Sequence, residues 1–220
     1  MNNRSDSSLL PPIREVFLSC ADVSYILVSD SKVGESWNQA SICRGFSVGG
    51  LAVHLTRGYS QVEVYLGGDE PQGAPVSAGE YYNTFPGLDN LNSEISKEIV
   101  AKSEEIAREG WEDFVARAGE SLNNLGRMLG DEPSGRLVKV AGDAIMTLDQ
   151  YLLTRIVELT VHVDDLAESV SLDSPPLSPD ALVLAIGTLV QSASVRYGSR
   201  AVLRALARPE LDKNNTLKIF

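Results

Sequence analysis

The sequence predicts a mainly all-α protein: a four-helix bundle with a small, mostly helical C-terminal extension. Three observations lead to this prediction. Apolar residues recur at helical spacing along four long segments. Two long connections separate these segments, as in bundles with crossover loops. Only the short stretches 136–141 and 216–220 have a strand-like composition, which is too little for a fold built on a sheet.

The first two predicted helices are placed by the residues at their N-termini. One covers about 12–29 and begins at a Pro-Pro pair, because proline is favoured in the first helical turn. The next covers about 48–66 and follows Ser47, whose side chain can accept a hydrogen bond from the first turn as an N-cap. The segment 67–88 is dense in Gly and Pro and is expected to be a long loop.

The other two bundle helices lie on either side of a second loop. The pattern from about 89 to 130 is helical, with a break or kink near Gly110 or Gly119, since glycine weakens a helix interior. A loop with a short extended piece at 136–141 then leads to a helix over roughly 147–170.

The rest of the chain is expected to be a short helical extension packed on the bundle. A Pro-rich break precedes a helix over about 178–197, and a shorter helix covers 199–207. The predicted division is therefore a bundle over 1–170 and an extension over 171–220.

The composition limits the classes of function. Thirty acidic and nineteen basic residues give a formal charge of -11, and no concentrated basic face for nucleic acid is visible. The two cysteines, Cys20 and Cys43, form neither a disulfide framework nor a zinc-finger spacing, and Cys43 is expected to be a small buried residue. The first residues show neither the apolar segment nor the small-residue cleavage site of a secretion signal, so none is expected. These features favour a cytoplasmic protein that does not bind nucleic acid.

The longest apolar run, 181–190, is about half as long as a bilayer crossing requires, so no membrane association is expected. The run is predicted to be a buried core helix. An apolar face on it is also compatible with a homodimer.

The segment "RIVELTVHVDD", which begins at Arg155, carries a row of ionisable residues. At about 100° per residue, Arg155, Glu158, His162 and Asp165 share an arc of about 80° on the helix. Hydrophobic residues border this arc on both sides, and a separate polar face includes Thr160. Ionisable groups between apolar flanks are costly unless they are paired or bind a metal.

Two interpretations fit this row. Glu158 and His162 are one turn apart, and carboxylate and neutral imidazole are good ligands for zinc and similar ions. Alternatively, Glu158 pairs with Arg155 while His162 pairs with Asp165, which needs no metal. The only other histidine, His54, lies at the margin of the core-facing arc of its own helix. This matching position favours a site shared by two helices.

Two motifs resemble one protein family. "WNQASICRGFSVGGLAVHL", from Trp37 to Leu55, is similar to the W-x-x-x-S-x-C-x-G-W-x-V-x-D-L-x-x-H-L segment of the mycothiol-dependent maleylpyruvate isomerase family. "YLLTRIVELTVHVDDL", from Tyr151 to Leu166, resembles that family's Y-L-x-x-R-x-x-E-x-x-V-H-x-x-D-L segment. The family belongs to the DinB/YfiT-like superfamily of metal-binding four-helix bundles, so the resemblance implies this fold.

The resemblance also implies a site and an activity. His54, Glu158 and His162 would hold a divalent metal, usually zinc, although nickel, iron or manganese also suit such ligands. Three protein ligands leave an open coordination position, where the cosubstrate mycothiol could bind as a thiolate. Arg155 and Asp165 would support these ligands during catalysis, with Asp165 orienting the His162 ring. The implied reaction is S-transfer or cis–trans isomerisation, in which the thiolate attacks an electrophilic small molecule.

Two departures from the first motif lie near His54: Phe46 stands where the motif has Trp, and Gly50 where it has Asp. The full α/β C-terminal domain of the isomerase is not expected within 220 residues, which weakens the expectation of maleylpyruvate as the substrate far more than that of metal binding. The alternative function is a non-catalytic metal-binding bundle, such as a sensor or accessory protein. A substrate-sized pocket beside the metal would favour the enzyme.

Overall fold

The computed structural model describes residues 13–84, 93–133 and 135–208. The helices of this part are α1 (Ile13–Val28), α2 (Ser31–Glu35), α3 (Val48–Leu66), α4 (Ala78–Tyr81), α5 (Glu94–Ala107), α6 (Trp111–Asp131), α7 (Leu148–Ser169), α8 (Pro179–Tyr197) and α9 (Ser199–Ala207). A two-stranded antiparallel hairpin, β1 (Leu137–Lys139) and β2 (Ile145–Thr147), precedes α7. The predicted all-α class is confirmed.

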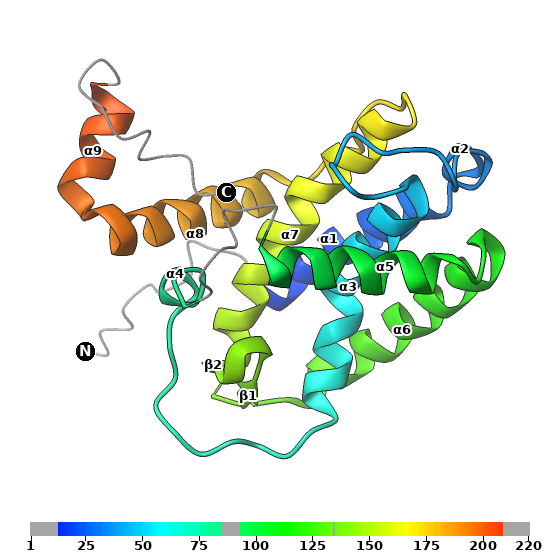
Figure 1. The fold of residues 1–220 in the computed structure, drawn as a ribbon. Helices are drawn as coiled ribbons and strands as arrows, with labels where there is room; N and C mark the ends of the chain where they lie inside the picture. The colour runs from blue at the N-terminus through cyan, green and yellow to red at the C-terminus, as the bar shows by residue number, and fades with distance from the viewer. Residues whose placement is uncertain (1–12, 85–92, 134, 209–220) are drawn as a thin grey trace, which may run out of the picture.

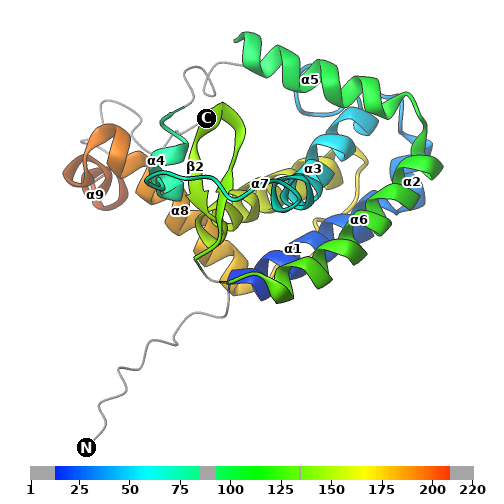
Figure 2. The same ribbon diagram turned by 90° about the horizontal axis from the view of Figure 1, so that it is seen from below.

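Four long helices, α1, α3, α6 and α7, form the bundle. Helix α7 packs against α1 and α3, and α6 packs against the same two helices from the other side. Figure 2 shows α1 beside α6, and α3 beside α7. Each of the four contributes a fully buried side chain to one core; examples are Phe17, Tyr59, Leu125 and Leu152. Burial of such side chains is the main source of stability in a bundle of this kind.

Helix α5 lies outside this bundle and packs on α3 (Figure 1). The predicted helical segment from 89 to 130 is therefore two helices, and Gly110 is the break between them. Its φ of 93° is a conformation that glycine adopts easily. Gly119, the other predicted position, lies within α6 against the Tyr25 ring.

The loops contain more structure than the sequence predicted. The extended piece expected at 136–141 is β1, and it pairs with the unpredicted β2. Gly142 and Asp143 make the turn between them, with φ values of 73° and 60°. Two short helices also form within predicted loops: α2, capped by Asp30, and α4, where Ser77 and Glu80 form a capping box.

The C-terminal helices α8 and α9 follow the expected bounds. Ser178 caps α8, with proline in its first turn. Helix α8 packs on α7 and α4, and α9 packs on α8 (Figure 1). The division of the chain at residue 170 stays a prediction, and the strand-like 216–220 lies outside the described residues.

The apolar run 181–190 is not buried on all sides, so the prediction of a core helix is wrong for one face. Ala181 and Ala185 are buried, whereas Val183 and Ile186 are 57% and 60% exposed. The homodimer stays a prediction. Within the described ranges, no helix is both long and apolar enough to cross a bilayer.

Candidate metal centre

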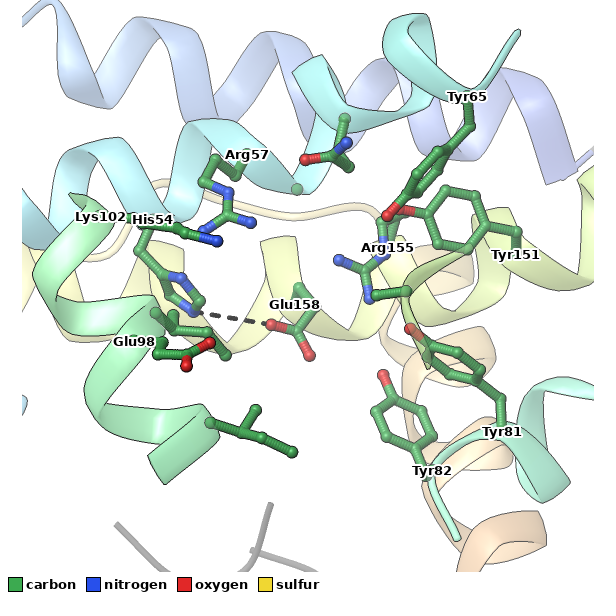
Figure 3. A pocket seen from close by; sticks show the side chains of 15 residues that line it. His54, Arg57, Tyr65, Tyr81, Tyr82, Glu98, Lys102, Tyr151, Arg155 and Glu158 are labelled. Carbon is green, nitrogen blue, oxygen red and sulfur yellow. Dashed lines mark ion pairs between the residues drawn. The ribbon is translucent and has the colours of Figure 1, made fainter. Parts of the chain in front are cut away.

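Three ligand-type side chains from two helices meet between α3 and α7. His54 lies on α3, while Glu158 and His162 lie one turn apart on α7. Their donor atoms all lie within 4.8 Å of one another. The Oε2 atom of Glu158 is 3.8 Å from Nε2 of each histidine, and Figure 3 shows its approach to His54. The structure therefore brings together the three predicted ligands.

Helix α3 approaches α7 closely at this level because Gly58 has no side chain. Gly58 lies one turn after His54 on α3. A Cβ at this position would lie 2.7 Å from Cδ2 of Leu159 and 4.0 Å from Cβ of Glu158. A larger residue would force the two helices apart, so the glycine helps set the distance between the donors.

The spacing of the donors fits a divalent cation. Tetrahedral zinc with bonds of about 2.0–2.2 Å places its donor atoms about 3.3–3.6 Å apart. The 3.8 Å separations around Glu158 need only a small contraction to reach this value. Two imidazoles and one carboxylate also suit nickel, iron or manganese. Three protein donors leave one position of a tetrahedral site open.

The His162 ring is held by Asp165 from the same helix. Its Nδ1 lies 2.8 Å from Oδ2 of Asp165. Burial would raise the pKa of Asp165, but the hydrogen bond from His162 lowers it, so the carboxylate is ionised and can only accept. The proton is therefore on Nδ1, and Nε2 faces Glu158. Burial would lower the pKa of His162, but Asp165 and Glu158 raise it.

A second donor cluster consists of Cys43, His162 and Asp165, whose ligand atoms also lie within 4.8 Å of one another. Cys43 is partly exposed and its thiol is hydrogen-bonded with Asp165. Burial first, and then Asp165, raises the pKa of Cys43 to about 12, which keeps the thiol protonated. The prediction that Cys43 is a small buried residue is confirmed in part: Cys43 is partly buried against the hydrophobic core, and it also contacts the side chain that orients His162.

The His54 ring is positioned by packing. It lies 5.3 Å from the Phe46 ring and 4.8 Å from the His162 ring, measured between centroids. Its Nδ1 atom is buried and has no hydrogen-bond partner among the residues that the structure describes. Burial first, and then the nearby His162, lowers the pKa of His54 to about 4. The imidazole is therefore neutral, as a metal ligand must be.

Arg155 influences Glu158 without touching it. Burial would raise the pKa of Glu158, but Arg155 and then the two histidines lower it, so the carboxylate is ionised. The guanidinium lies over the Tyr151 ring, 5.0 Å from its centroid, and Nε donates to Oγ1 of Thr154. Between the described residues, no ion pair within 4.0 Å joins Arg155 to Glu158. The alternative pairing predicted from the sequence thus holds for His162 with Asp165 but not for Glu158 with Arg155.

The N-terminus of α3 receives a carboxylate from α5. Oε1 of Glu104 accepts from the backbone N–H of Ser47 at 2.7 Å and lies 3.0 Å from its hydroxyl. A Cβ at Gly50 would overlap the Glu104 carboxylate. The motif has Asp at position 50, where this chain has Gly. Glu104 from α5 instead places its carboxylate at the N-terminus of α3. This contact joins α5 to the helix that carries His54.

Two cavities adjoin the three donors. The first, called the polar cavity below, has a volume of about 250 Å³ and is the more polar of the two. Besides His54 and Glu158, its wall includes three cationic side chains and four tyrosines: Arg57, Lys102, Arg155, Tyr65, Tyr81, Tyr82 and Tyr151. Figure 3 shows Glu158 between the His54 side of this cavity and its tyrosines.

The second cavity has a volume of about 240 Å³ and is mainly apolar. It shares His54, Glu158 and Ile99 with the first cavity and is also lined by His162. The other apolar side chains of its wall are Phe46, Val100, Val157 and Val161.

Several residues that complete these cavities were not predicted from the sequence. Tyr81 and Tyr82 follow the S-x-x-E capping box at Ser77, a signal for a helix start that the sequence contains. Lys102 and Val100 carry no such signal, because their role depends on how α5 packs on α3. Thr160, predicted to lie on the solvent-exposed face of its helix, is instead buried, with only 8% of its surface exposed.

A family model covers most of the bundle. It is described as the mycothiol maleylpyruvate isomerase N-terminal domain and matches residues 26–167, which include the three donor residues. No curated protein and no solved structure matches the chain. The family inferred from the two motifs is confirmed: the chain belongs to the mycothiol maleylpyruvate isomerase N-terminal domain family.

Proposed function

We propose that this protein binds one divalent metal ion through His54, Glu158 and His162 and catalyses the reaction of a low-molecular-weight thiol with an electrophilic small molecule. The family supports mycothiol as the thiol. The observation that carries the proposal is the convergence of three donor atoms beside two cavities of substrate size. Because free thiols persist in reducing compartments, the proposed reaction belongs in the cytoplasm.

A divalent metal held here would supply positive charge that lowers the pKa of a thiol. The protein's own residues prepare the site for it. Asp165 holds His162 with Nε2 directed at Glu158, and Arg155 favours the ionised form of Glu158. Such partners commonly change metal affinity or activity by roughly 10- to 100-fold.

The reaction itself has two forms. In S-transfer, the sulfur forms a bond to the electrophilic carbon while a leaving group departs or a double bond takes up a proton. In isomerisation, the adduct rotates about the former double bond and then expels the thiol unchanged. The cavities hold the reactants near one point, which is a large part of the catalysis of a bimolecular reaction.

Metal content tests the ligand assignment. The purified, untagged protein should contain about one divalent ion per chain, and His54→Ala, Glu158→Gln and His162→Ala should each abolish it. Glu98→Gln is the matched control, because Glu98 is a carboxylate of the polar cavity outside the donor cluster. Stoichiometric metal in both histidine variants would overturn the assignment.

A thiol-consumption assay then separates an enzyme from a non-catalytic metal-binding protein. Mycothiol should disappear faster than in buffer with at least one electrophile, and the His162→Ala variant should abolish this acceleration. Bound metal without acceleration across a broad panel of electrophiles would favour the sensor or accessory function. The two adjoining cavities support the enzyme.

A further inference from the structure

The two cavities beside the donor cluster differ in chemistry. The polar cavity offers hydroxyl, amide and cationic groups, among them Tyr81, Gln61 and Arg57. The apolar cavity is walled largely by valines, Phe46 and Ile99. Because His54 and Glu158 line both, a molecule in either cavity can reach the same point.

A reaction between two molecules needs such an arrangement. The reacting atoms must approach within about 3–3.5 Å, while the rest of each molecule requires its own volume. A thiol attached to a polyhydroxylated group matches the hydrogen-bonding groups of the polar cavity. It would leave its hydroxyls without partners in the apolar cavity, which is unfavourable.

The apolar cavity has little to offer a charged molecule. Val157 is 1% exposed and Val161 41%, so the wall runs from the core to the surface. Arg44, the cationic residue in the wall of this cavity, is exposed to solvent. Its charge is therefore well hydrated and attracts an anion only weakly. A divalent metal on the donor cluster would have its charge balanced by Glu158 and the bound thiolate, so a carboxylate here would lose its own hydration without an equivalent partner.

The size of the apolar cavity fits a small aromatic molecule. An apolar cavity of about 150 Å³ binds benzene. The volume of about 240 Å³ therefore leaves room for a substituted ring.

Resting on the proposed function, we infer that the apolar cavity is the electrophile subsite and that it selects uncharged, apolar electrophiles of about one substituted aromatic ring. The polar cavity receives the thiol. Val100 on α5 and Val161 on α7 are the residues that determine this specificity from opposite helices.

Probe binding tests the subsite without turnover. The purified protein should bind the uncharged single-ring fluorophore dimethylaminobenzonitrile, and toluene should displace it whereas maleate should not. Val161→Glu and Val100→Glu should each weaken binding by about tenfold or more, since a carboxylate in an apolar pocket is costly. Val64→Glu is the matched control, because Val64 is 63% exposed and lines neither cavity. Displacement by maleate but not by toluene would overturn the inference.

Kinetics test the assignment of the two reactants. With mycothiol and chlorodinitrobenzene, a carbon–sulfur bond forms, the carbon–chlorine bond breaks, and chloride and a proton are released. The carboxylate-bearing chlorodinitrobenzoate should have a kcat/KM about tenfold lower or more. Val161→Glu should raise the KM for chlorodinitrobenzene and leave that for mycothiol unchanged, whereas Arg57→Met, at the partly buried cation of the polar cavity, should do the reverse.

The outcomes separate this inference from the proposed function. A protein without metal or thiol consumption refutes the proposed function, while probe displacement still tests the apolar cavity. A preference for chlorodinitrobenzoate that is lost in Arg44→Gln would refute only the subsite assignment. Metal content should be unchanged in Val100→Glu, so that a loss of electrophile binding is not a loss of the metal.

Discussion

The two helices that carry the donor cluster position their residues in different ways. Helix α7 supplies Glu158 and His162 one turn apart, and Asp165 on the same helix holds the His162 ring. Helix α3 supplies only His54, whose Nδ1 has no hydrogen-bond partner among the described residues and whose ring rests against Phe46. The α7 side is thus set by local spacing, and the α3 side by contacts between distant segments.

This comparison predicts that the largest effects follow from changes in the packing of α3. Gly58→Ala should destabilise the protein by about 1–3 kcal/mol, the usual cost of overpacking, because the new Cβ would lie 2.7 Å from Leu159. Metal affinity should fall as well, since His54 moves away from α7. Denaturant unfolding and a metal titration measure the two effects.

Gly126→Ala is the matched control for this change. Gly126 lies in α6, where a Cβ would have nothing within 4 Å. This variant should be stabilised by about 0.5–1 kcal/mol, the usual gain from replacing a glycine within a helix. Equal behaviour of the two variants would show that the close approach at Gly58 does not matter.

On the α7 side, the orienting hydrogen bond should control metal affinity more than stability. Asp165→Asn should weaken metal binding by roughly 10- to 100-fold, as for other partners of metal-bound histidines. Asp164→Asn, a change at the neighbouring acid outside both donor clusters, is the control and should have little effect. Competition with a chelator measures the dissociation constant of the metal in each variant. A ratio near one would contradict the orienting role of Asp165.

The contact between Glu104 and the N-terminus of α3 should have a smaller effect. Glu104→Ala should cost about 1–2 kcal/mol, because it removes a charged acceptor at a helix N-terminus. Gly50→Ala should cost a similar amount by displacing the same carboxylate. The double variant should then be no less stable than the worse single variant, since both remove one interaction. Additive losses in urea unfolding would contradict this account.

Cys43 should give the smallest effect. Cys43→Ser keeps a hydrogen-bond donor next to Asp165 and should change stability by less than about 1 kcal/mol. Metal content should stay near the wild-type value, because Cys43 is not one of the three proposed ligands. Loss of metal in this variant would point to the cluster of Cys43, His162 and Asp165 instead.

The same contrast explains what could be predicted from the sequence. The bundle helices were predicted because apolar periodicity is a local property, and Glu158 and His162 because their spacing is local. The position of His54 beside them was inferred from its place on its own helix and from the motif. The contacts of Glu158 were harder to predict, because its carboxylate approaches both histidines rather than Arg155.

Features that depend on contacts between helices were missed. The cavity walls come partly from α5, whose place on α3 no local pattern encodes. The prediction that the run 181–190 is buried was also wrong for one face of α8, because an apolar run does not show which side of the helix packs against another element. Strand β2 escaped prediction because three residues are too few to show an alternating pattern.

The overlap between position 50 and Glu104 also constrains the order of evolutionary change. A side chain at position 50 and the Glu104 carboxylate would occupy the same volume. A lineage that acquires a side chain at position 50 must therefore either displace the Glu104 carboxylate, and so lose its contact with Ser47, or replace Glu104. Related sequences with the motif's Asp at position 50 should consequently lack Glu at position 104, and the two positions should covary although they lie 54 positions apart in the sequence.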